Sequence, residues 1–320
     1  MSKSIDSCLR DEGIEIIIVN DGSTDNTAEI AEEYTRAYPG IIQTIHQKNK
    51  GHGGAINTGL KAASGRFVKI VDSDDWLDSN AYDAVFKALC KFDDSNCPDM
   101  VVSNYTYDKA GKKSKTTIRY TNTFPVNKIF TWYDVKKFRL GHYLLMHAIT
   151  YRLDLLRECD LSMPEHTFYV DSIYAYLPLV KVEKMYYVNE NLYQYAIGRE
   201  DQSVQEKTMI NRIDQQLAVN RTMIKSVNMS TVTPRQKQWC MMHYLSIVTT
   251  VSSILLLKSG TKENLEKKRA LWCFIAQKDK SLYKRLLRCF LGRGVNLKGR
   301  VGRKIAVTIY NTSQRFVGFS

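Results

Sequence analysis

The feature that most constrains the fold is a pattern in the first 105 residues, in which a short apolar run, a turn and a helical segment follow one another repeatedly. Ile14 to Val19 is an apolar run that ends in Asn-Asp-Gly, which is typical of a buried parallel strand followed by a turn. Residues 27–38 then carry apolar side chains at helical spacing. Further strands are predicted at 41–45, 67–71 and 100–107. Strands and helices that alternate in this way predict an α/β fold with a doubly wound, mostly parallel sheet.

Acidic residues follow two of these predicted strands directly. Asp21 lies in Asn-Asp-Gly after the first, and Asp72, Asp74 and Asp75 lie in Asp-Ser-Asp-Asp after the third. Ligands of doubly wound sheets bind at the carboxyl ends of strands. Clustered carboxylates repel one another unless a cation lies between them, and Mg²⁺ or Mn²⁺ binds carboxylates together with phosphates. The cluster indicates a metal clamp for a phosphorylated ligand, with helix capping and turn formation as the alternative.

A glycine-rich segment, Asn-Lys-Gly-His-Gly-Gly, follows the second predicted strand. We expect a turn here and a helix from Ala55 to Ala63. The backbone N–H groups of Gly53 and Gly54 would then lie at a helix start, where the helix dipole favours phosphate. His52 is expected to be solvated, as loop histidines usually are, with phosphate contact as the alternative. The same sheet edge would therefore present both carboxylates and phosphate-binding amides.

The stretches EIIIVNDGSTDNT and NKGHGGAINTGLKAASGRFVKIVDSDDWLD resemble the nucleotide-binding domain of family 2 glycosyltransferases, which have the GT-A fold. The resemblance covers residues 14 to about 105, with several motifs in the family's order, and continues more weakly to GREDQSV. It implies a metal-dependent, inverting glycosyltransferase that uses Mn²⁺ or Mg²⁺. The donor would be a nucleotide sugar, with UDP as the expected nucleotide. The acceptor would be a glycan or lipid-linked molecule in cell-surface polysaccharide synthesis.

The resemblance also implies roles for single residues. Asp21 matches the aspartate that contacts the nucleotide base. Asp72 and Asp74 match the DXD pair, in which the first reaches the ribose or the metal and the second binds the metal on the donor diphosphate. Asp171 matches the general base that removes the proton of the acceptor hydroxyl, and the alternative for this residue is a helix N-cap ahead of residues 172–179. Arg199 matches a basic residue near the diphosphate.

Two departures from the family pattern favour a different function. Val170 precedes Asp171 where the family has Glu. Family members also have an apolar strand ahead of a helix resembling SKSIDSCL, and the sequence starts inside that helix, so the first strand of the fold is expected to be missing. The alternative is therefore a non-catalytic remnant or scaffold that binds nucleotide sugars. Retention of Asp21, Asp72, Asp74 and Asp171 favours the enzyme.

The formal net charge of +13 is concentrated at the end of the chain. Residues 258–320 hold 16 Lys and Arg against 3 Asp and Glu, which leaves 30 of each in the first 257 residues. From Gly292 onward the basic residues are mixed with apolar ones, which favours an anionic membrane surface as the partner. A solvated helix face is the main alternative. Nucleic acid is not expected, because no recognised reading motif accompanies the charge.

Three regions are expected along the chain. Residues 1–107 would form the nucleotide-sugar-binding half, shortened at its N-terminus, and 108–204 the acceptor-binding half with the catalytic base. Residues 205–320 would form a helical region with a basic tail. Within the second region, Trp132 to Cys159 is predicted to be largely helical, and Met185 to Tyr195 to form one strand.

A cytoplasmic location, with peripheral association at the inner face of the plasma membrane, is expected. The first residues lack the pattern of a secretory signal, and the seven cysteines show no metal or disulfide spacing. Trp239 to Leu257 is long and apolar, but it has a polar stripe on one helical face. This stripe favours a core or interfacial helix over a membrane span.

Overall fold

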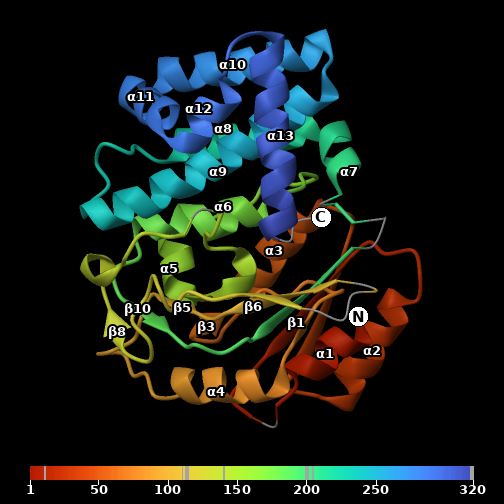
Figure 1. Cartoon of the computed structure of the whole chain (residues 1–320). Helices are drawn as coiled ribbons and strands as arrows, with labels where there is room; N and C mark the ends of the chain where they lie inside the picture. Colours follow the sequence, from red (N-terminus) through yellow and green to blue (C-terminus); the bar gives the residue numbers. More distant parts are fainter. Residues whose placement is uncertain are drawn as a thin grey trace. The chain divides into compact units, whose positions relative to one another are not determined.

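The computed structural model describes residues 1–10, 12–109, 111, 115–139, 141–198, 202–203 and 205–317, with side chains through residue 312 in the last helix. The chain forms two compact units (Figure 1). The first comprises Met1–Lys136 and Leu144–Ile197, and the second comprises Lys137–Tyr143 and Gly198–Ser320. The first unit is α/β and the second is helical.

The first unit opens with the predicted cycles of strand and helix. Its first elements are α1 (Ser2–Cys8), β1 (Ile16–Asp21), α2 (Thr27–Ala37), β2 (Ile42–Gln47) and α3 (Gly51–Ala62). Strands β1 and β2 are parallel, with Ile16 opposite Ile42 and Asp21 opposite Gln47. Both strands therefore end at the same edge, where the acidic and glycine-rich segments follow.

Two further sheets complete the first unit. The five-stranded sheet has the order β3 (Phe67–Val68), β9 (Ile149–Arg152), β5 (Met100–Val102), β10 (Met185–Tyr187), β8 (Ile129–Phe130). The four-stranded sheet has the order β4 (Trp76–Leu77), β11 (Tyr193–Ile197), β6 (Tyr105–Lys109), β7 (Thr116–Ile118). The pairs β5–β10 and β6–β11 are parallel, and the other pairs in these sheets are antiparallel. The predicted α/β class is confirmed.

Two predicted strands are each divided between these sheets. Residues 100–107 leave the five-stranded sheet at Ser103, and residues 185–195 leave it after Tyr187. Asn104 explains the division, because its fully buried side chain donates to the side chains of Asn189 and Asn191 at 3.0 and 3.2 Å. A buried amide needs such partners, so the backbone turns toward them and both chains enter the next sheet together.

The prediction that Trp132 to Cys159 is largely helical is wrong. Among the residues of this stretch that the structure describes, only short 3₁₀ turns at Trp132–Asp134 and Met146–Ala148 and the helix α5 (Leu153–Glu158) are helical. Ile149 to Arg152 forms β9 instead, which lies between β3 and β5 and is buried through its first three residues. β-Branched and aromatic side chains fit this sandwiched position, and these pairings to distant strands override the local pattern.

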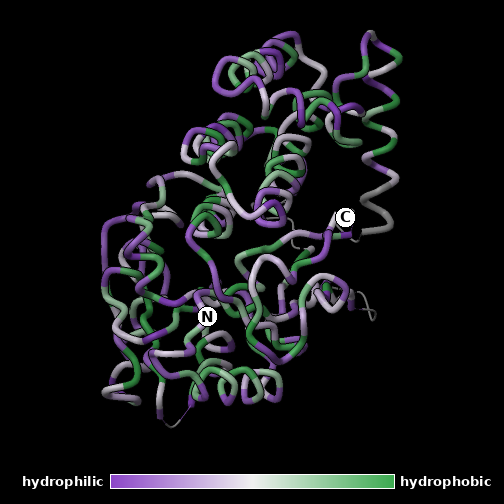
Figure 2. The backbone as a smooth tube through the Cα atoms, turned by 90° about the vertical axis from the view of Figure 1, so that its left-hand side faces the viewer, coloured by the Kyte–Doolittle hydropathy of each residue, from purple (hydrophilic) through white to green (hydrophobic). Residues whose placement is uncertain are grey.

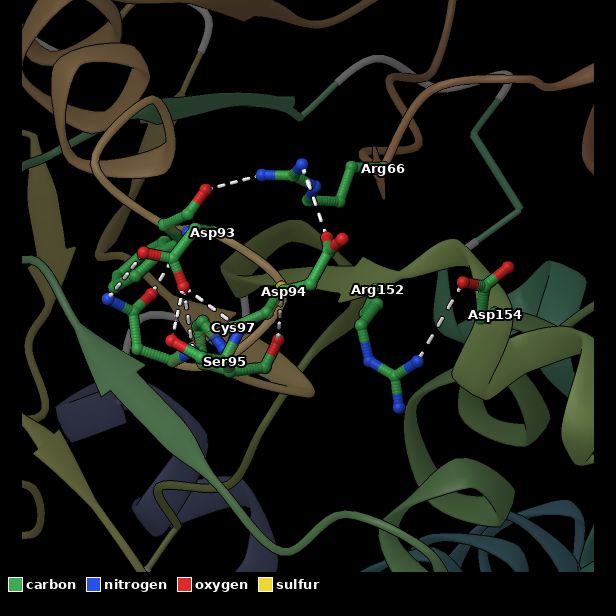
Figure 3. Close-up of polar contacts among 10 residues, drawn as sticks. Arg66, Asp93, Asp94, Ser95, Cys97, Arg152 and Asp154 are labelled. Carbon is green, nitrogen blue, oxygen red and sulfur yellow. Dashed lines mark hydrogen bonds and ion pairs between the residues drawn. The ribbon is translucent and has the colours of Figure 1, made fainter.

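Two arginines at the end of the five-stranded sheet contact the loop after α4 (Ser79–Leu89), and Figure 3 shows the contacts of Arg66 with this loop. Arg66, next to β3, donates to the carbonyl of Phe92 and lies 3.4 Å from the Asp94 carboxylate. Arg152, at the end of β9, donates to Asp99 at 3.0 Å. The Asp94 side chain is 98% exposed, so its pair with Arg66 contributes little stability, whereas the Asp99 side chain is only 14% exposed.

The second unit is formed mainly by seven helices among its described residues. They are α7 (Glu206–Asn211), α8 (Ile213–Ser226), α9 (Arg235–Ser259), α10 (Lys262–Lys278), α11 (Lys280–Arg288), α12 (Phe290–Val295) and α13 (Gly299–Val317). Helix α9 contacts α7, α8, α10, α12 and α13, so it is the central helix of this unit.

Helix α9 is long and apolar enough to cross a membrane, but 83% of its apolar window is buried inside the protein. In the polar stripe predicted for this segment, Ser246, Thr250 and Ser253 are buried and His243 is half-buried. Thr249 bonds Asn220 of α8, and Ser253 accepts a hydrogen bond from the Trp272 indole of α10 at 3.1 Å. Satisfied polar groups of this kind fix the packing of a helix among its neighbours. These contacts agree with the predicted core helix.

Candidate active site

The acidic segment forms a tight turn between β3 and β4. The Asp75 N–H donates to the Asp72 carbonyl at 3.0 Å, which closes the turn. Helix α1 supports it from behind, because the Ser4 hydroxyl donates to the same carbonyl at 3.2 Å and the Ser7 hydroxyl accepts from the Leu77 N–H. Asp74 is at the exposed tip of the turn, whereas the side chain of Asp72 is 26% exposed.

His52 contacts the acidic turn, so the expectation that it is solvated is wrong. Its Nε2 lies 3.2 Å from Oδ1 of Asp72. Burial lowers the pKa of His52, but the hydrogen bond and attraction to Asp72, helped by Asp171 and Asp74, outweigh burial and raise it. For Asp72 the directions are reversed. Burial raises the pKa of its carboxyl, but the contact with His52 lowers that pKa below its usual range. Each partner thus favours the charged form of the other.

Asp171 is the first residue of α6 (Asp171–Tyr176), and Val170 occupies the N-cap position. Burial raises the pKa of the Asp171 carboxyl, attraction to His52 opposes the rise, and repulsion from Asp72 adds to it. The structure thus brings Asp171 into the field of the acidic turn, although 99 positions separate it from Asp72 in the sequence. Burial raises the pKa of the Tyr195 hydroxyl well above its usual value, and the charges of Asp171 and of the three aspartates of the turn add to the rise.

The glycine-rich segment is helical, which differs from the predicted turn, because α3 begins at Gly51 rather than at Ala55. Gly53 and Gly54 are buried in its first turn. A Cβ atom on Gly53 would lie 2.3 Å from the carbonyl oxygen of Pro164. The absence of a side chain at Gly53 therefore lets α3 approach the backbone of residues 163–166, the segment that leads to Asp171.

Reciprocal hydrogen bonds join the same two segments. Asn57 of α3 donates to the carbonyl of Met163 at 2.9 Å and accepts from its N–H at 2.8 Å. The His166 N–H donates to the carbonyl of Lys50 at 2.6 Å. Helix α3 therefore positions the segment that carries the candidate base.

Asp21 lies at the end of β1, as predicted, and fastens the start of α3. Its Oδ1 accepts from the Gln47 amide at 2.6 Å and from the Lys50 N–H at 2.8 Å. These bonds order the loop between β2 and α3, at the edge where a nucleotide is expected. Arg199, the remaining predicted site residue, lies outside the described residues.

Sequence reasoning missed the group of side chains beneath the acidic turn. Asp75 is 1% exposed and accepts from the Tyr193 hydroxyl at 2.6 Å and from the Ala196 N–H at 2.8 Å. The same hydroxyl accepts from the Asp72 N–H at 3.2 Å. Tyr193 therefore bridges the buried and the partly exposed aspartate of the turn. The sequence gives only a weak signal for this bridge, an aspartate next to the DXD pair and a distant aromatic strand.

We expect Tyr193→Phe to lower the free energy of unfolding by about 1–2 kcal/mol, because the buried Asp75 carboxyl loses a hydrogen-bond partner. Chemical denaturation measures the effect. Tyr133→Phe is the matched control, since Tyr133 is 75% exposed. Equal behaviour of the two variants would show that the bridge does not support the turn.

Two sets of residues have the chemistry of a metal site. Asp72, Asp75 and His147 offer ligand atoms within 4.8 Å of one another, and Nδ1 of the buried His147 has no hydrogen-bond partner among the described residues. However, both oxygens of Asp75 already accept hydrogen bonds, and the ammonium group of Lys69 donates to the His147 carbonyl. Mg²⁺ and Mn²⁺ need room for water and phosphate oxygens. Asp72 and Asp74 are more open than Asp75 and His147, so they leave more room around a bound ion.

Comparison with known proteins agrees with this geometry. Residues 1–151 match the family model for glycosyl transferase family 2. The chain is 30% identical over 210 residues to the uncharacterized glycosyltransferase EpsJ of Bacillus subtilis (strain 168), covering 61% of this chain and 56% of that protein. It is 29% identical over 203 residues to the minor teichoic acid biosynthesis protein GgaA of the same organism, covering 63% and 44%. The chain thus spans about half the length of these curated relatives.

Among solved structures, residues 1–349 of S. aureus TarS share the fold. The TM-score is 0.67 at 16% sequence identity, and the match covers 98% of this chain and 88% of that one. TarS 1–349 has also been solved in complex with UDP, and that structure matches with a TM-score of 0.60. At this identity the likeness establishes the fold alone.

Proposed function

The chain belongs to glycosyltransferase family 2, and we propose that it transfers a sugar from a UDP-sugar to a glycan or lipid-linked acceptor in cell-surface polysaccharide synthesis. The observation that carries the proposal is the contact of His52 with Asp72 at 3.2 Å, with Asp171 near enough for its charge to act on both residues. The UDP complex of TarS and the teichoic acid role in the name of GgaA support the donor and acceptor classes.

Asp171 acts as the general base in this proposal. A sugar hydroxyl is a weak nucleophile near neutral pH, so a carboxylate must accept its proton as the oxygen attacks the anomeric carbon. The raised pKa of Asp171 suits this task, because a base is most effective when its pKa approaches the working pH. The oxygen–carbon bond forms as the bond to the diphosphate breaks, so the anomeric centre is inverted.

Asp72 and Asp74 would hold Mn²⁺ or Mg²⁺ against the donor diphosphate, and the bound ion would supply positive charge to stabilise the leaving group. His52 keeps Asp72 ionised and oriented for this role. Asp21 contacts the nucleotide base. The first turn of α3, with Gly53 and Gly54, faces the diphosphate, where the helix dipole favours negative charge.

The same proposal assigns partners and location. Residues 1–107 bind the donor and residues 108–204 the acceptor. The enzyme works in the cytoplasm, at the inner face of the plasma membrane, where the basic end of the chain meets anionic lipid and a lipid-linked acceptor is within reach. Nucleic acid is not a partner in this scheme.

We expect Asp74→Ala to weaken Mn²⁺-dependent binding of UDP-sugars by about tenfold or more, because the ion would lose one of its two protein carboxylates. Titration calorimetry with UDP-glucose, UDP-galactose and UDP-GlcNAc, with and without Mn²⁺, measures the change. Asp94→Ala is the control, since the Asp94 side chain is 98% exposed and distant from the acidic turn in the sequence. Metal-independent binding in the unaltered protein would overturn the metal role. Binding without turnover of any donor would favour a non-catalytic binding protein.

A further inference from the structure

Exposed apolar side chains concentrate near the end of the second unit. Twelve large hydrophobic residues are exposed in the part of the chain that the structure describes, and five of them lie between residues 290 and 309. They are Phe290, Leu297, Val301, Ile305 and Ile309. Figure 2 shows hydrophobic and hydrophilic residues alternating along α13. Such a concentration on one segment marks an interaction surface.

Helix α13 has two different apolar sides. Gly302 and Ala306 are buried where the helix packs within its unit, which includes contacts with α9. Val301, Ile305 and Ile309 are spaced four residues apart and therefore form one stripe along the helix. Their exposed fractions are 71%, 45% and 46%. The packing of the second unit therefore leaves this stripe uncovered.

The charge around the stripe has a single sign. No Asp or Glu occurs after Asp279, whereas residues 280–320 contain ten Lys and Arg. Lys298, Arg300 and Lys304 are exposed on or next to α13. Phosphate groups are the anions that such a surface can neutralise beside an apolar layer, because Lys and Arg contact headgroups while apolar side chains enter the acyl boundary.

We propose that the exposed face of α13 docks on an anionic lipid bilayer, with Val301, Ile305 and Ile309 inserted below the headgroups and Arg300 and Lys304 paired with lipid phosphates. The inference rests on the proposed function in one respect, since it assigns to α13 the contact that keeps the enzyme near a lipid-linked acceptor. An apolar stripe of this kind has no use on nucleic acid, where binding depends on phosphate contacts and base edges.

The test is co-sedimentation of the full chain with vesicles of phosphatidylcholine alone or of phosphatidylcholine with phosphatidylserine. We expect binding only to the anionic vesicles, weakened by salt. The triple variant Val301→Ser, Ile305→Ser, Ile309→Ser and the double variant Arg300→Gln, Lys304→Gln should each bind about tenfold more weakly or worse. The control is Val126→Ser with Ile129→Ser, which removes two side chains of the first unit that are 40% and 39% exposed.

Several outcomes would overturn the proposal. One is equal binding to both vesicle types, and another is unchanged binding of the α13 variants. A third is a loss of vesicle binding in the Val126 and Ile129 control that equals the loss in the α13 variants. Binding of an RNA oligonucleotide in place of lipid would assign the face to nucleic acid. Self-association that depends on the stripe, without vesicle binding, would assign it to a second copy of the chain. Hydrolysis of UDP-sugars in solution is measured in parallel and should be unaffected by the α13 variants. Absence of donor binding in the unaltered protein, with vesicle binding retained, would refute the proposed function and leave the membrane surface standing.

Discussion

Asp171→Asn is expected to lower the rate of sugar transfer by about 10²–10⁴-fold while UDP affinity stays within a few-fold of its original value. Asparagine has nearly the same shape as aspartate but cannot accept the proton of the attacking hydroxyl. The change removes a charge that repels Asp72, so the acidic turn should be at least as stable as before. UDP release from UDP-sugars, with water or an acceptor glycan as the nucleophile, measures the rate, and calorimetry measures the affinity.

The pH dependence gives a second test of the same base. Burial and repulsion from Asp72 raise the pKa of Asp171, so the carboxylate is lost as the pH falls through that raised value. The rate should fall with it, and Asp171→Asn should lack this acidic limb. Asp94→Asn should retain full activity and the normal pH profile, because its side chain is exposed. A mutant that keeps the normal rate would show that another group serves as the base.

Gly53→Ala is expected to destabilise the first unit by about 3 kcal/mol, near the upper end for an added methyl group in a packed interior. The new Cβ would lie 2.3 Å from the Pro164 carbonyl oxygen and 2.9 Å from Cβ of Met163. Backbone at residue 164 cannot move aside as a flexible side chain can, so α3 or the 163–166 segment must shift. Activity should fall with stability, because the segment leads to Asp171.

Gly59→Ala is the matched control for this prediction. Gly59 lies in the same helix, and a Cβ there would meet only the Val19 side chain, at the ordinary distance of 3.7 Å. Alanine is the better helix former, so this variant should be stabilised by roughly 0.5–1 kcal/mol. Thermal and denaturant unfolding compare the two variants. Equal stability of Gly53→Ala and the unaltered protein would mean that the close contact with Pro164 is not rigid.

The parts of the fold that depend on neighbouring residues could be predicted from the sequence. Strands β1 and β2 and the helices that follow them are set by apolar runs, turns and helical spacing within about 50 residues. Strand β9 could not be predicted, because its conformation depends on pairing with β3 and β5, whose positions the local pattern does not specify. The divided strands depend on Asn104 meeting two asparagines more than 80 residues later.

The residues of the candidate site also divide into those that a local sequence signal indicates and those that depend on distant partners. Asp72 and Asp74 stand out because carboxylates directly after a strand are a local signal, and the family resemblance adds Asp171. The contact between His52 and Asp72 was missed, since an isolated histidine in a glycine-rich segment has no local feature that indicates its partner. The bridge between Asp75 and Tyr193 was missed for the same reason, because 118 positions separate the two residues.

The pairing of α3 with residues 163–166 also sets where this protein can be recombined with a relative. Asn57 and Met163 exchange two hydrogen bonds, and Gly53 fits the carbonyl of Pro164. A chimera that takes its donor-binding half from one parent and its acceptor-binding half from another would separate these surfaces at their closest contact. Exchange of acceptor specificity between relatives therefore requires that α3 and the segment through Asp171 be inherited from the same parent.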